Sequence, residues 1–146
     1  MDKYFGEWKD SGFFGMVADF SDVYLTEAEY KAEEAPYANV AHWQEKKRDM
    51  DAALASDDYK DAEILLADYE AEGYEGDAFV LFKRDGKLWE VNGSHCSCYG
   101  LEGQWKPEEV TAEVLRQRLE RATYGRFHDD QDFRAALNEV LAGATP

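Results

Sequence analysis

The chain has 146 residues, of which 45% are hydrophobic and 14% aromatic, and this favours one packed domain over a disordered acidic segment. Its formal net charge of -16 comes from 32 acidic and 16 basic residues. Such a charge disfavours direct binding to nucleic acid or to an anionic membrane, so any charged partner is expected to be basic. The sequence shows neither a signal-peptide pattern nor an apolar run long enough to span a bilayer, which predicts a cytoplasmic protein.

The first 25 residues are rich in aromatic side chains and glycine, and are expected to supply one or two short strands. Thr26 and Glu29 have the spacing of a capping box, which predicts the start of a short helix that Pro36 ends. From Tyr37 to about Leu54, apolar side chains recur every three or four residues. This spacing predicts an amphipathic helix.

The next segment, from Tyr59 to about Glu72, is also predicted to be helical and to end at Gly73. On that helix an apolar stripe would face the core, and carboxylates would flank it on both sides. The outer members of one row, Asp61 and Glu72, would lie about 16 Å apart, a distance comparable with a few backbone phosphates. The segment is therefore predicted to present a fixed acidic surface.

The clearest local pattern is a β-hairpin over about residues 78–91, with Asp85-Gly86 at its turn. Two further helices are predicted, from about Glu108 to Ala122 and from about Asp130 to Leu141. The order of elements predicts an α+β fold. We expect one compact domain over residues 1–146, with a small antiparallel sheet, extended by an N-terminal strand, packed with four to five helices.

Both cysteines lie in the segment VNGSHCSCYGLEGQW, residues 91–105, and three interpretations of it are open. In a structural loop, Cys96 and Cys98 would share one side of an extended segment, glycines would form tight turns, and Trp105 would pack on the core. In a zinc site, the available ligands are Cys96, Cys98, His95 and His128, although a second ligand pair of the usual spacing is missing.

In the third interpretation, Cys98 is a reactive nucleophile with His128, or less readily His42, as its base. The letters SCY resemble the SCW around the nucleophile of papain-like proteases, in which the cysteine opens a helix. Here GLEGQW follows, and its two glycines do not indicate a helix. The sequence therefore departs from that family where its chemistry would be set.

The segment from Gly73 to Glu109 resembles a recurrent segment of small uncharacterised phage and mobile-element proteins, in which a hairpin leads into GSHCSCYGLE. The resemblance covers about a quarter of the chain. It implies a phage or mobile-element setting, and therefore the cytoplasm of a bacterial host, but no reaction and no catalytic residue.

These observations predict an interaction protein and not an enzyme. By charge it resembles DNA-mimicking anti-restriction and anti-CRISPR proteins, which occupy the nucleic-acid groove of a basic host defence protein. No cofactor is expected; zinc or a reactive thiol at the cysteine loop is the alternative, and a homodimer is also open. The predicted partner-binding residues are the acidic and aromatic side chains of residues 57–75: Asp57, Asp58, Asp61, Glu63, Asp68, Glu70, Glu72, Glu75, Tyr69 and Tyr74.

Overall fold

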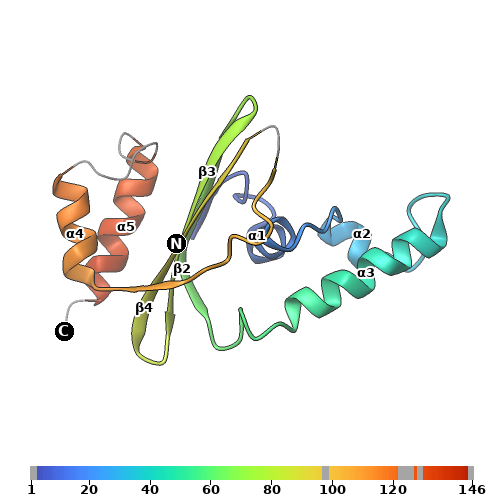
Figure 1. Ribbon diagram of the computed structural model, residues 1–146, viewed down its shortest axis with the longest axis horizontal. Helices are drawn as coiled ribbons and strands as arrows, with labels where there is room; N and C mark the ends of the chain where they lie inside the picture. Colours follow the sequence, from blue (N-terminus) through green and yellow to red (C-terminus); the bar gives the residue numbers. More distant parts are fainter. Residues whose placement is uncertain (1–2, 97–98, 122–126, 128–129, 145–146) are drawn as a thin grey trace.

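A computed structural model of the protein describes residues 3–96, 99–121, 127 and 130–144. Its elements are, in chain order, β1 (Tyr4–Gly6), α1 (Gly12–Ser21), α2 (Glu27–Lys31), α3 (Val40–Leu54), β2 (Glu63–Glu72), β3 (Glu75–Arg84), β4 (Lys87–His95), β5 (Glu108–Val110), α4 (Ala112–Glu120) and α5 (Gln131–Ala144). The strands form one sheet in the order β1-β2-β3-β4-β5. Helices α1 to α3 lie on one side of it and α4 and α5 on the other (Figure 1). The predicted α+β fold is confirmed.

The predicted hairpin is confirmed and is longer at both ends than expected. β3 and β4 pair antiparallel from Gly76 opposite His95 to Arg84 opposite Lys87. At the turn, Asp85 has φ 55° and Gly86 has φ 75°. Two positive φ angles match the twist of the flanking strands, and aspartate and glycine tolerate them best.

The predicted helix over residues 59–72 is wrong, because this segment forms β2 from Glu63 onward. β2 pairs in parallel with β1 and antiparallel with β3, so it lies inside the sheet. Helices cover both faces of the sheet, and a strand buried on both faces has a continuous apolar run instead of an alternating pattern. The run from Ile64 to Ala67, with a register irregularity between Ile64 and Leu66, is such a case. Intrinsic helix propensity is a weak preference that this burial overrides.

Other boundaries also differ from the prediction: α2 ends at Lys31, before Pro36, and α3 begins at Val40 and not at Tyr37. The N-terminal strand exists as β1, but the aromatic residues after it form α1, a helix whose buried side chains extend around most of its circumference. Near the C-terminus, residues 108–110 are strand β5, and α4 starts only at Ala112, because the Thr111 side chain accepts a hydrogen bond from the Val114 amide. The capping box of Thr26 and Glu29 and the helix ending at Leu54 are confirmed.

Each face of the sheet has its own apolar core. On the α1–α3 side, Trp8, Met16 and Phe82 are fully buried; on the α4–α5 side, Phe79 and Phe133 are. Neighbouring residues of one strand point to opposite cores. Asp68 and Tyr69, which are adjacent in β2, therefore lie on opposite sides of the sheet.

Candidate functional site

A cleft of about 940 Å³ lies on the α1 side of the sheet, near the ends of β2 and β4. The segment between β1 and α1, one face of α1 and the segment leading into α2 form its walls, and Tyr69, Ala71 and His95 contribute from the sheet. Its lining includes five carboxylates: Glu7, Asp10, Asp19, Glu27 and Glu29. Among the described residues that line it there is no lysine or arginine.

The floor of the cleft is held by a network of aromatic and polar groups. The indole nitrogen of buried Trp8 donates a 2.7 Å hydrogen bond to Asp19 Oδ2. The Tyr69 hydroxyl lies 2.7 Å from His95 Nδ1, and the Trp8 and Tyr69 rings are 5.2 Å apart. Gly76 is needed beneath His95, because a Cβ atom there would collide with the imidazole. These hydrogen bonds and ring contacts therefore fix the positions of the side chains at the bottom of the cleft.

The electrostatic character of the cleft is visible in the groups that titrate there. The pKa of Tyr69 is raised to about 12, mainly by burial and further by the negative charges of Asp19 and Glu7. Burial also raises the pKa of Asp19, while the Trp8 hydrogen bond opposes the rise. Within the cleft lining, Glu27 forms an exposed ion pair with Lys31 at 3.6 Å, and such pairs contribute little. The cleft is thus a strongly anionic surface.

The structure does not bring the ten predicted partner-binding residues together as one surface. Asp57, Asp58, Asp61 and Glu63 lie at or before the start of β2, and Glu72, Tyr74 and Glu75 lie at its far end. The two ends of β2 are about 30 Å apart at the usual rise of a strand. The two predicted rows of carboxylates do not form, because they required this segment to be a helix and it is a strand.

Between these ends, Tyr69 lines the cleft, whereas Asp68 and Glu70 face the α4–α5 side. Asp68 is fully buried and cannot contact a protein partner, which corrects that assignment. The turn carrying Tyr74, which is 79% exposed, continues directly from Ala71 at the edge of the cleft. Of the ten predicted partner-binding residues, Tyr69 therefore lies in the cleft and those of this turn lie beside it.

Sequence reasoning missed the five cleft carboxylates. The available signal was the acidic character of the first half of the chain, in which these residues are scattered among aromatic side chains. Their convergence depends on α1 folding back over the sheet, and the segment of α1 was expected to be extended.

The cysteine loop is held by side chains that favour the structural interpretation. Cys96 pairs with Tyr99 through the backbone, and the Gln104 side chain bonds to the backbone of Ser94 and Gly100. Trp105 packs on Phe82, with ring centroids 5.6 Å apart, as predicted. Cys98 and His128 lie outside the described residues, so the zinc and thiol alternatives stay predictions.

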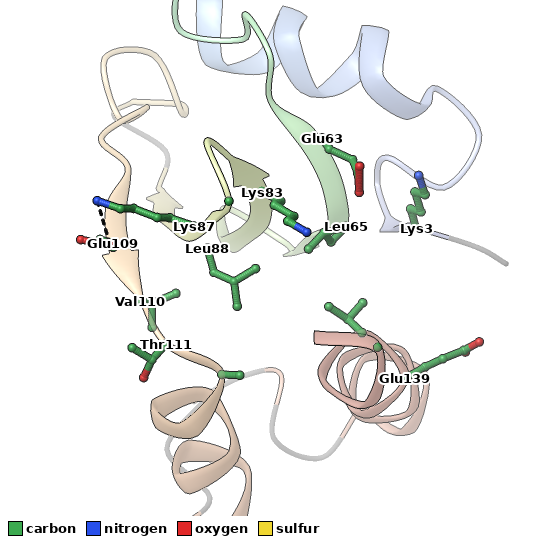
Figure 2. A pocket seen from close by; sticks show the side chains of 14 residues that line it. Lys3, Glu63, Leu65, Lys83, Lys87, Leu88, Glu109, Val110, Thr111 and Glu139 are labelled. Carbon is green, nitrogen blue, oxygen red and sulfur yellow. Dashed lines mark ion pairs between the residues drawn. The ribbon is translucent and has the colours of Figure 1, made fainter. Parts of the chain in front are cut away.

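A second hollow, of about 600 Å³, lies on the α4–α5 side between the sheet and α5 (Figure 2). Leu65, Leu88 and Val140 give it apolar walls. Its charged rim consists of Lys3, Lys83, Lys87, Glu63, Glu109 and Glu139. Lys87 pairs with Glu109 at 3.6 Å. Because its lysines and glutamates are equal in number, this pocket does not select a charged ligand as the acidic cleft does.

The protein therefore has an α+β fold with an anionic cleft on one side of its sheet. Comparisons with protein-family models, curated proteins and solved structures find no match for this chain. Within the described residues, no helix is both long and apolar enough to cross a membrane.

Proposed function

We propose that the protein is a cytoplasmic interaction protein that binds a basic, nucleic-acid-binding host protein and competes with nucleic acid for its surface. The observation that supports this proposal is the anionic cleft, whose lining includes five carboxylates and, among the described residues, no lysine or arginine. A rigid array of negative charge complements a surface that binds phosphates. The resemblance of residues 73–109 to phage and mobile-element proteins agrees with a host defence protein as the target.

The net charge and the exposed aromatic side chains have separate roles in this binding. A charge of -16 accelerates association with a basic protein over a range that salt shortens. Charge alone leaves the complex weak, and buried aromatic anchors supply most of the affinity in many interfaces. Tyr24 in the cleft and Tyr74 beside it are both 79% exposed and provide such anchors.

In the homodimer alternative, the C-terminal arginines of one copy would pair with the acidic half of a second copy; these are Arg116, Arg118, Arg121 and Arg126, of which Arg126 lies outside the described residues. Arg118 pairs with the buried Glu90 at 2.6 Å. Arg116 donates to the Leu141 carbonyl oxygen at 2.9 Å, and Arg134 approaches the Leu119 carbonyl oxygen. Arg116 and Arg118 are therefore engaged within their own chain, which favours an external basic partner over this pairing.

The test is a capture experiment with three immobilised proteins and nuclease-treated bacterial lysate, at low and at moderate salt. The first is the wild type, and the second is the cleft variant Glu7→Gln/Asp10→Asn/Glu27→Gln. The third is a control, Asp57→Asn/Asp58→Asn/Asp61→Asn, which removes the same charge from the segment before the start of β2, at the end of the strand remote from the cleft. Asp19 and Glu29 are kept because they make hydrogen bonds within the fold.

We expect wild type and control to capture the same nucleic-acid-binding protein, the cleft variant to lose it, and added duplex DNA to release it. The captured protein is then purified and its binding repeated with the three variants. Equal capture by all three proteins would refute the cleft as the binding surface. Capture that DNA does not reverse would refute competition with nucleic acid.

A further inference from the structure

Three carboxylates converge on the side of the sheet opposite the acidic cleft. Asp68 and Glu70 project from the same face of β2, and Asp130 lies immediately before α5. One oxygen from each can be chosen so that all three lie within 4.8 Å of one another. Asp130 is held in place, because its Oδ1 accepts hydrogen bonds from the backbone amides of Asp132 and Phe133. Strand β2 and the segment before α5 therefore place their carboxylates close together.

The member of this cluster that points to a ligand is Asp68. Its side chain is fully buried, and apart from the neighbouring Glu70 carboxyl group neither carboxylate oxygen has a hydrogen-bond partner within the described part of the chain. Buried polar groups in proteins are almost always paired, because removing a carboxylate from water without a partner is costly. β1 restricts access, since a Cβ atom on Gly6 would lie 2.9 Å from Asp68 Oδ1. A macromolecule cannot reach this carboxylate, but a small cation can satisfy it.

We propose that Asp68, Glu70 and Asp130 bind a hard divalent cation, with calcium the best match. Oxygen ligands are those that calcium, magnesium and manganese prefer. Two oxygens on one calcium ion can be separated by up to about 4.6–5.2 Å, twice the calcium–oxygen distance, so the 4.8 Å limit of the cluster is compatible with a shared ion. Water and backbone oxygens complete such a site.

The electrostatics of the three groups agree with this assignment. The pKa of Asp68 is raised to about 8, mainly by burial and further by a hydrogen bond with the Glu70 carboxyl group and the negative charges of Glu70, Asp130 and Asp132. Burial likewise raises the pKa of Glu70, with Asp130 and Glu7 adding negative charge nearby. A cation at this point would offset the repulsion among the three carboxylates. Because carboxylates bind a metal in their ionised form, cation affinity is expected to increase as the pH rises.

The test is calorimetric titration of the metal-stripped full chain with calcium chloride, and electron paramagnetic resonance titration with manganese chloride, at pH 6 and pH 8. Asp68→Asn and Asp130→Asn remove one ligand charge each, and asparagine at position 130 retains the ability to cap α5. Glu113→Gln is the matched control, because it removes one exposed charge from α4, away from the cluster. Circular dichroism confirms that each variant is folded.

We expect one calcium or manganese ion per wild-type chain, bound more tightly at pH 8 than at pH 6. Each cluster variant should weaken binding by about tenfold or more, while Glu113→Gln leaves it unchanged. Absence of saturable binding to the wild type at pH 8 would overturn the proposal and leave a proton as the occupant of the cluster. Binding by Asp68→Asn or Asp130→Asn that is as tight as binding by the wild type would also overturn it. Neither result depends on whether the acidic cleft binds a protein.

Discussion

Replacing Asp68 with asparagine should change how the free energy of unfolding depends on pH, because this carboxyl group ionises differently in the folded and unfolded chains. Its pKa is about 8 in the folded protein, against 3.8 for the ordinary side chain. The folded state therefore holds the proton more tightly than the unfolded state does. The contribution of this proton to the free energy of unfolding is fully present below about pH 4 and is lost as the pH rises toward 8.

The size of the effect follows from the width of that pH window. Between the two pKa values, each pH unit costs the folded state up to about 1.4 kcal/mol. From pH 5 to pH 7 the wild type should therefore lose about 2–3 kcal/mol through this group, and Asp68→Asn should not show that loss. Glu70 shares the proton, and Asp130 and Asp132 act on it from the start of α5, so the measured value belongs to the cluster.

Urea unfolding at pH 5, 6 and 7, in the presence of a chelator, measures the difference in unfolding free energy between wild type and Asp68→Asn. The variant should gain stability relative to the wild type as the pH rises. Glu113→Gln serves as the control for the general effect of removing one negative charge. A difference that stays constant within error from pH 5 to pH 7 would refute the assignment of a raised pKa to Asp68.

Three other substitutions test contacts that hold the fold. Gly6→Ala should destabilise the protein by about 3 kcal/mol or more, because φ is 66° there and a Cβ atom would collide with the Tyr69 carbonyl oxygen; thermal unfolding measures this, and a change below about 1 kcal/mol would contradict it. Gln104→Ala should cost about 1–3 kcal/mol by removing the side chain that bonds to the loop backbone, and faster amide exchange at Ser94 should accompany it. Arg118→Met should cost about 3 kcal/mol in denaturant unfolding because Glu90 is 3% exposed and would lose its cation; unchanged stability would show that the Glu90 charge is satisfied without Arg118.

Local patterns predicted the elements whose cause is local. Asp85-Gly86 defines a turn with its own two residues, and Thr26 and Glu29 satisfy each other's backbone donors within four positions. Both features were visible in the sequence because no distant contact is needed to produce them.

The segment 59–72 failed for the opposite reason. Its leucine, alanine and glutamate residues favour a helix in isolation, and the burial of both faces of β2 depends on helices from both ends of the chain. The acidic cleft and the Asp68 cluster could not be predicted for the same reason, because both depend on distant contacts. Glu7 and Glu27 line one cleft only when α1 packs on the sheet, and Asp130 is 62 positions from Asp68 in the sequence. Convergence of this kind has no short-range spacing that a pattern could detect.

The alternation of side chains along β2 gives its acidic and aromatic residues two different chemical environments. Tyr69 faces an open cleft lined by carboxylates, whereas Asp68 and Glu70 face a closed point between β1 and α5. An exposed carboxylate keeps its hydration and acts mainly through long-range attraction, which salt weakens. A buried carboxylate has lost its hydration and needs a proton or a cation at bonding distance. Salt sensitivity should therefore belong to the cleft and pH sensitivity to the Asp68 cluster, so each proposed site can be tested while the other is left intact.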